Sequence, residues 1–388
     1  MKKTEITEQG PDLFLKFKVL EKLQTFFPII LALSVLKTPF ETKLYLNIFP
    51  PLVGLLFLLT FRKIEKTFYS LVLMLSLGIF VSSYHGDWKG VMRIGQVLCM
   101  IGFTCQVSNF SKKDYILFLK SLLIIFTIVY GLEAALGLES YNRKILGFNT
   151  NRYSGPVGEV NYSAIILAGM TLLWLYFSKW KAFLFSFILL GFSNSRTALL
   201  MMVEGSFGIS FSSHPSFKKV IGYFNKILLA LLFLTPLIIY LVNVFAPHST
   251  KASLEVLSSG RFYLYVPYIN MGLDNLLGIG YFRGWDNYHI FLDPMKELVD
   301  SIRGSQLNEQ HNIFIQVFSE FGLIGYGFFI AFLYGIFKRI QETNELERER
   351  RLSLFVALLL GYSLLNGLND MIFYFIIGLV INKNKLYE

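Results

Sequence analysis

Three arginines set in polar turns are the residues of this chain best suited to bind an anionic group. Arg196 follows Ser195 between two apolar runs, and Arg261 follows Gly260. Arg152 stands shortly before a Gly-Pro turn. A guanidinium can hold two oxygens of a phosphate or carboxylate through its planar fork of N–H donors. Arg196 also begins a predicted helix, whose N-terminal dipole favours an anion. We therefore expect an anion-binding site built from these arginines.

Each arginine also has a structural alternative. A single arginine near a membrane surface can extend its charge to the interface without binding a ligand. Arg152 can instead pair with Glu159, which lies just beyond the turn.

One histidine stands where it could act on a hydroxyl group. His311 and Asn312 begin a strongly apolar segment, and Gln316 and Glu320 follow Asn312 at four-residue spacing on one helix face. A polar stripe that enters a bilayer is costly, so we expect it to face a protein-lined cavity. With an ordinary pKa near neutrality, His311 could take the proton from an attacking hydroxyl. The alternative is that His311 only caps its helix.

The sequence predicts neither a metal site nor a cofactor. Cys99 and Cys105 lie six residues apart, on different faces of one apolar run, and we expect them to be small core residues. A metal site around His311 is the less favoured alternative, because its candidate ligands lack the spacing of known sites. Those ligands are His289, Asp293 and Glu309.

The composition indicates the elements that must position these residues. The 388 residues are 54% hydrophobic and only 16% charged, with a mean hydropathy of +0.53. A soluble domain of this size carries more charge. We therefore predict an all-α integral membrane protein, in one polytopic domain covering residues 1–388.

Hydropathy predicts about twelve spans, several of them shorter than a square crossing needs. They are expected at 23–36, 44–60, 68–84, 91–107, 115–136, 161–177, 182–194, 196–212, 227–246, 312–337, 352–366 and 371–382.

Basic residues predict the orientation. Lysine and arginine clusters alternate with turns that carry few of them, as positive-inside topology requires, and this pattern explains the net charge of +10 without nucleic acid. The N-terminal segment 1–22 and the tail 383–388 should be cytoplasmic, and the 247–311 loop, with short helices, external. The mixed-charge run 342–351 should be a solvated cytoplasmic helix face.

Four motifs occur in order across the predicted external loop and its flanks. They are Ser195-Arg196, Ser259-Gly260-Arg261, Gly278-Ile279-Gly280, and His311-Asn312 with Glu320, Gly322 and Gly325. The two glycines of the third motif allow a close backbone approach or a sharp turn. In these motifs and in topology, residues 150–345 resemble the O-antigen ligase and O-antigen polymerase family of multi-span bacterial glycosyltransferases.

The resemblance implies a metal-independent enzyme of the bacterial cytoplasmic (inner) membrane, with an undecaprenyl-pyrophosphate-linked oligosaccharide as donor. His311 would be the catalytic base, and Arg196, Arg261 and Arg152 would hold the donor pyrophosphate. The supporting residues would be Asn312, Gln316, Glu320, Ser195 and Gly260. Tyr263, Tyr265, Tyr281 and Trp285 are candidate sugar-stacking platforms, and anchoring at the membrane interface explains them equally well.

We favour a polymerase that joins repeat units into O-antigen, capsular polysaccharide or exopolysaccharide. The first alternative is a ligase that transfers the glycan to lipid A-core, and the second is a transporter or flippase of the same pathway. A transporter should show internal repeats and charges at the bilayer midplane, and the sequence shows no repeats. A chain-length regulator and a flippase are the expected partners.

Overall fold

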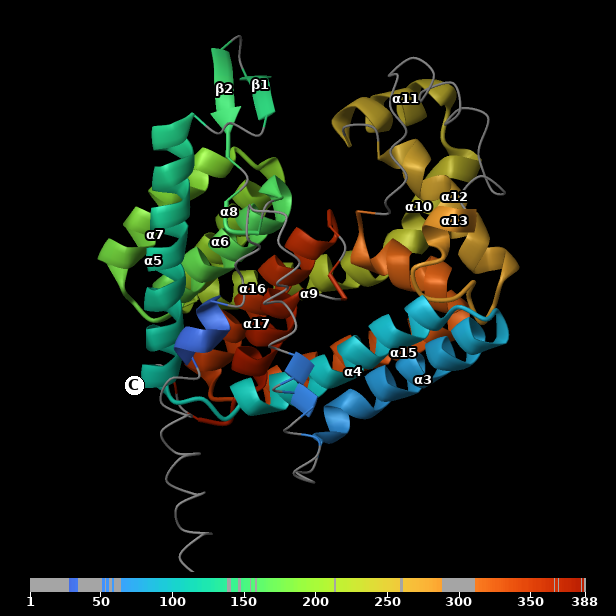
Figure 1. The fold of residues 1–388 in the computed structure, drawn as a ribbon, viewed down its shortest axis with the longest axis horizontal. Coiled ribbons are helices and arrows are strands. Elements are labelled where there is room, and N and C mark those ends of the chain that lie inside the picture. Colours follow the sequence, from blue (N-terminus) through green and yellow to red (C-terminus); the bar gives the residue numbers. More distant parts are fainter. Residues whose placement is uncertain are drawn as a thin grey trace, which may run out of the picture.

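The fold is a bundle of α-helices with one small hairpin (Figure 1). The computed structural model describes residues 28–33, 51–52, 54–55, 58, 64–137, 141–145, 148–153, 155–157, 159–212, 214–258, 261–287, 311–365, 367–368, 370–384 and 386. The elements are η2 (Lys66–Phe68), α3 (Tyr69–Tyr84), α4 (Trp88–Val107), α5 (Lys112–Leu136), β1 (Tyr141–Ile145), β2 (Phe148–Arg152), α6 (Val160–Tyr176), α7 (Trp180–Ser193), α8 (Arg196–Phe211), α9 (Pro215–Phe233), α10 (Thr235–Phe245), α11 (His248–Leu257), α12 (Phe262–Asp274), α13 (Gly284–Asn287), α15 (Ile313–Gln341), α16 (Glu345–Tyr362) and α17 (Met371–Ile381).

Nine of the predicted spans correspond to single helices, which are α3 to α8 and α15 to α17. Within the described residues, four helices are long and apolar enough to cross a membrane, or five if one bent pair counts as a span. The helices α6, α7 and α17 are apolar but shorter. The predicted spans 23–36 and 44–60 fall largely outside the described residues, so the total of twelve stays a prediction.

The predicted span 227–246 is wrong as a single helix. It is divided between α9 and α10, which meet at an angle of 65°. Pro236 lies in the first turn of α10, and a proline cannot donate the backbone hydrogen bond that would continue α9. The all-α prediction also missed β1 and β2, which pair antiparallel from Tyr141 opposite Arg152 to Ile145 opposite Phe148.

Small residues bring the central helices close together. The helix α8 packs between α6 and α16, and a Cβ on Gly205 would lie 2.6 Å from a methyl carbon of Leu172 on α6. A Cβ on Gly208 would overlap the hydroxyl of Ser353 on α16. Without side chains at these positions the backbones can approach closely, which is how helices associate inside a bilayer.

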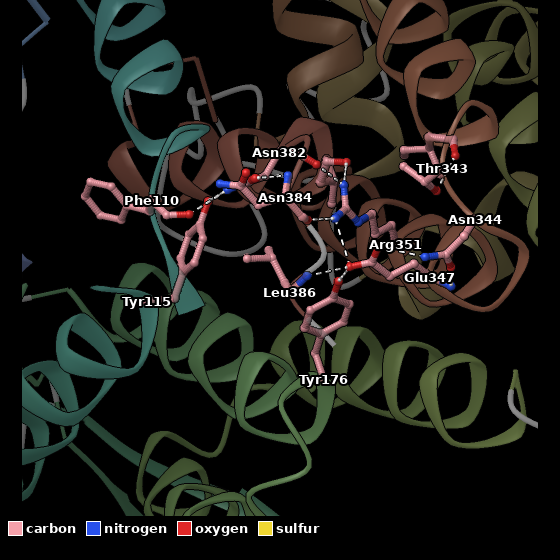
Figure 2. Close-up of polar contacts among 12 residues, drawn as sticks. Phe110, Tyr115, Tyr176, Thr343, Asn344, Glu347, Arg351, Asn382, Asn384 and Leu386 are labelled. Atoms are coloured by element: carbon pink, nitrogen blue, oxygen red, sulfur yellow. Dashed lines mark hydrogen bonds and ion pairs between the residues drawn. The ribbon is translucent and has the colours of Figure 1, made fainter. Parts of the chain in front are cut away.

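The prediction that 342–351 is a solvated face is wrong for its second half. Glu347 and Arg351 are buried and form an ion pair of 2.9 Å, drawn in Figure 2. The Glu347 carboxylate also accepts hydrogen bonds from the Tyr176 hydroxyl at 3.2 Å and from the Leu386 backbone at 3.1 Å. Arg351 donates to the carbonyls of Val380, Asn382 and Asn384. These charges therefore join α16 to α6, α17 and the end of the chain.

Candidate functional site

Arg261 is held at the start of α12 by hydrogen bonds from the end of α11. The Ser258 hydroxyl accepts from the backbone N–H groups of Arg261 and Phe262, at 3.2 and 3.0 Å. The buried Glu255 carboxylate accepts from the backbone of Tyr263 at 3.0 Å. The first N–H groups of a helix need such acceptors, so α11 and α12 form a rigid corner at Arg261. The preceding Ser259 and Gly260 lie outside the described residues.

His311 lies next to Arg261. Its backbone has a φ of +43°, and its carbonyl accepts a hydrogen bond from Tyr265 of α12 at 3.5 Å. Burial and, to a lesser extent, the positive charge of Arg261 together lower the pKa of His311 to about 4. The expectation of an ordinary pKa near neutrality is therefore wrong. The imidazole is uncharged at neutral pH and is able to accept a proton.

The polar stripe that begins at Asn312 is buried inside the protein, and the cavity expected beside it stays a prediction. The Asn312 side chain caps α15, accepting from the backbone of Phe314 at 2.9 Å and of Ile315 at 3.2 Å. Its amide also donates to the Ser363 carbonyl at 2.6 Å, so Asn312 fixes the start of α15 against the end of α16. Further along α15, Gln316 donates to the Glu320 carboxylate at 3.3 Å.

Glycines allow the loop after α12 to lie directly on α15. Helix α15 breaks at Gly322, where φ is +67°, and the loop pairs with the backbone groups that the break leaves unbonded. The backbone N–H of Gly280 donates to the Glu320 carbonyl at 3.1 Å, and that of Ile324 donates to the Leu276 carbonyl at 3.2 Å. A Cβ on Gly278 would overlap the backbone of Glu320, and a Cβ on Gly322 would overlap the backbone of Gly278. The sequence-based expectation of a close backbone approach at Gly278 and Gly280 is confirmed.

Arg196 lies in a second polar turn. The Ser195 hydroxyl caps α8 by accepting from the backbone of Ala198 at 3.4 Å, and Arg196 is exposed. Within the described residues, no hydrogen bond or ion pair joins Arg196 to Arg261 or His311.

Arg152 ends β2, and the structure does not describe its side chain. The next residue, Tyr153, donates from its backbone to the Phe192 carbonyl at 3.3 Å, so the base of the hairpin lies beside the end of α7 and the Arg196 turn. Glu159 caps α6, accepting from the backbone of Tyr162 at 2.7 Å, and Asn161 lies inside the helix.

The segment that carries Arg196, Arg261 and His311 was compared with known protein families. Residues 181–330 match the family model described as O-antigen ligase. Residues 181–330 are similar to that family. This stretch, called here the O-antigen ligase domain after the family that it resembles, begins in α7 and ends in α15, so it contains Arg196, Arg261 and His311. A comparison with curated proteins gives no match.

The match confirms the resemblance stated from the sequence motifs. Together with the apolar helices, it supports a multi-pass membrane enzyme that processes glycans, and it does not distinguish a polymerase from a ligase.

The tyrosines expected to stack on sugars are buried in the O-antigen ligase domain. Tyr263, Tyr265 and Tyr281 are at most 6% exposed, so their faces pack against protein. The side chain of Trp285 lies outside the described residues. Among described residues, no group of three metal-ligating side chains is present, while His289, Asp293 and Glu309 fall outside them.

Sequence reasoning missed a carboxylate close to the start of α15. Asp370 caps α17 by accepting from the backbone of Ile372 at 2.9 Å, and burial raises the pKa of its carboxyl. A Cβ on Gly367 would lie 2.5 Å from the Tyr362 ring and 3.1 Å from Ile313, so the α16–α17 turn covers the first residue of α15. An acidic residue immediately before the apolar run 371–381 is a helix-cap pattern, and that pattern could have identified Asp370.

Proposed function

We propose that this protein polymerises oligosaccharide repeat units carried on undecaprenyl pyrophosphate, at the outer face of the bacterial cytoplasmic membrane. The products would be O-antigen, capsular polysaccharide or exopolysaccharide. The observation that carries the proposal is the meeting of an uncharged His311 with Arg261 inside the O-antigen ligase domain.

The reaction transfers a sugar from a diphosphate to a hydroxyl group. The acceptor oxygen attacks the anomeric carbon, the bond from that carbon to the diphosphate oxygen breaks, and the diphosphate leaves with the electron pair. His311 takes the proton of the acceptor hydroxyl. Charge develops on the leaving diphosphate, and a fixed guanidinium at Arg261 stabilises that charge more as it grows.

Arg196 and Arg152 are proposed as further contacts of the same diphosphate. Arg196 is exposed and, within the described residues, is not bonded to Arg261 or His311, so the diphosphate would have to bridge the two turns. Gln316 and Glu320 would orient the acceptor hydroxyl from the buried stripe, while Asn312, Ser195 and Gly260 maintain the local backbone. We propose that the enzyme needs no metal because arginine supplies the positive charge.

The test is transfer by the purified protein with a synthetic polyprenyl-diphosphate-linked repeat unit as donor. We expect chain growth coupled to release of polyprenyl diphosphate, unaffected by chelator. Arg261→Lys should keep part of the activity, since lysine retains the charge and loses the bidentate fork. The matched control is Arg339→Gln, because Arg339 only pairs with Glu342 on the surface. Wild-type protein that moves the donor across a bilayer without breaking the sugar–diphosphate bond would instead indicate the transporter.

A ligase is the second candidate, because the family description names that activity. Transfer to lipid A-core with no chain growth on repeat units would establish it.

The orientation remains a proposal, with both termini cytoplasmic and the 247–311 loop outside. Single cysteines at position 253, which is exposed, and at position 300, in a background without Cys99 and Cys105, should react with an impermeant reagent added outside. Cysteines at 218 and 345 should not react. Labelling of both sets from the same side would overturn the orientation.

A further inference from the structure

The turn between α3 and α4 is packed onto the loop that follows α12. The Ser82 hydroxyl, at the end of α3, accepts a hydrogen bond from the backbone of Tyr281 at 3.3 Å. A Cβ on Gly90 of α4 would lie 2.9 Å from both the Tyr281 carbonyl and the Ser82 hydroxyl. In Figure 1 the turn is in blue and cyan, beneath α12 and α13. Segments about 190 residues apart in the chain therefore form one surface here.

Two arginines lie on this surface, one from each segment. The guanidinium carbon of Arg93 on α4 is 3.6 Å from the centre of the Phe282 ring. Phe282 is 41% exposed and has a φ of +64°, a backbone conformation that is costly for a bulky residue. Arg283 folds over Gly280, with its Cδ 3.2 Å from where a Cβ would stand. We call Arg93, Phe282 and Arg283 the Arg93 cluster.

The charges of the Arg93 cluster have no acidic partner among the described residues, since no carboxylate there forms an ion pair with Arg93 or Arg283. A guanidinium above an aromatic ring keeps its in-plane N–H donors available to a ligand. Trp88 and Tyr84, at the same turn, are 70% and 81% exposed, and such aromatic residues anchor proteins at the headgroup level of a bilayer. The cluster thus presents two positive charges at the depth of lipid phosphates.

The Arg93 cluster is connected to the buried polar stripe of α15 without being part of it. The loop that carries Phe282 and Arg283 bonds to the Glu320 carbonyl through Gly280, and the Tyr281 ring packs 5.4 Å from that of Phe321. A lipid headgroup on the cluster would have its sugars next to this loop.

We propose that the Arg93 cluster binds the diphosphate of a second lipid-linked repeat unit, the acceptor, separately from the donor diphosphate at Arg261. The inference rests on the proposed polymerase function, since a polymerase joins two substrates that each carry a lipid diphosphate. A ligase needs only one such site.

Two-substrate kinetics in nanodiscs of uncharged phosphatidylcholine test the proposal. The donor is a repeat unit whose acceptor hydroxyl is blocked, and the acceptor is an unblocked repeat unit on polyprenyl diphosphate. Arg93→Gln and Arg283→Gln should each raise the acceptor KM roughly ten- to hundred-fold, as expected for losing a charged hydrogen bond, and leave the donor KM unchanged. Arg261→Gln should do the reverse. Lys89→Gln, in the same turn, is the control and should change neither KM.

Several outcomes would overturn the proposal. An unchanged acceptor KM would do so, as would equal rises in both KM values, which would indicate a general distortion of the loop. Arg93→Lys, which keeps the charge over Phe282, guards against a folding defect in Arg93→Gln and should lie between that variant and wild type. Anionic phospholipid can also be added to the nanodiscs. If the variants differ from wild type only in how this lipid changes the rate, and not in acceptor KM, the cluster binds bilayer headgroups and the proposal fails. Absence of transfer by wild-type protein with every donor and acceptor pair would instead refute the proposed function.

Discussion

Arg351 of α16 and Arg261 at the start of α12 have different surroundings. The Arg351 guanidinium is 1% exposed, is paired with Glu347, and donates to three carbonyls (Figure 2). Arg261 instead lies near the uncharged His311, and the residue after His311, Asn312, bonds to Ser363 at the end of α16.

The difference shows how a buried charge can be assigned to stability or to chemistry. A charge whose donors are all used by backbone carbonyls and a carboxylate serves to join helices. A guanidinium that instead lies beside a proton acceptor, with no carboxylate partner in the described part of the chain, keeps its capacity for a ligand. The fold therefore separates a structural end, at Arg351, from the proposed reactive end, at Arg261 and His311.

The largest expected effect on stability is at the structural end. Arg351→Met should destabilise the protein by about 3–5 kcal/mol, because it leaves Glu347 buried without its partner. Adding Glu347→Leu should recover part of that loss. Thermal unfolding in detergent measures both, with Glu345→Gln as the control, since its exposed pair with Lys218 should contribute little. An unchanged Tm for Arg351→Met would mean that the network does not hold the helices together.

A smaller effect is expected at the break in α15. Gly322→Ala should cost about 1–3 kcal/mol, because alanine is strained at a φ of +67° and its Cβ would overlap the backbone of Gly278. Activity should fall as well, since the loop loses its position on Glu320. Gly327→Ala is the matched control in the same helix, where a Cβ meets no atom within 4 Å. Equal unfolding curves and activities for the two variants would contradict the role of the break.

The smallest expected effect is on pH dependence. Arg261→Gln removes a positive charge that disfavours the protonated imidazole, so the pKa of His311 should rise from about 4. The acidic limb of kcat/KM should then move to higher pH, measured as a full pH profile of each protein. The free energy of unfolding should depend on the same imidazole. Because the fold keeps His311 neutral, its contribution to that free energy is fully present above the unfolded pKa of about 6.5 and is lost as the pH falls toward 4. An acidic limb at the same pH in both proteins would separate His311 from Arg261.

Much of the fold could be predicted from the sequence because hydropathy alone determines where long apolar helices lie. The helices α3 to α8 followed directly from it. The paired glycines at 278 and 280 predicted a close backbone approach, since only glycine tolerates one. The association of Arg261 with His311 followed from motif order, although 50 residues separate them.

The remainder depends on tertiary contacts that local sequence does not contain. The run 342–351 has the composition of a solvated helix, and Glu347 and Arg351 are buried only because Tyr176 and the end of the chain supply their partners. The low pKa of His311 arises mainly from burial, which the local sequence does not show. The contact of Arg93 with Phe282 is likewise a tertiary contact between distant segments.

The central claim is that His311 acts on a proton rather than only ending a turn, and one substitution separates the two roles. His311→Asn keeps a residue that tolerates a positive φ and can bond to the backbone, and it removes the proton acceptor. Turnover of purified, normally folded His311→Asn with the lipid-linked donor, measured together with donor binding, is the most direct test. We predict that turnover falls by about 10²–10⁴-fold, the usual contribution of a positioned base, while donor binding is unchanged. Full activity of His311→Asn would contradict the proposed base and leave only the anion-binding role of Arg261.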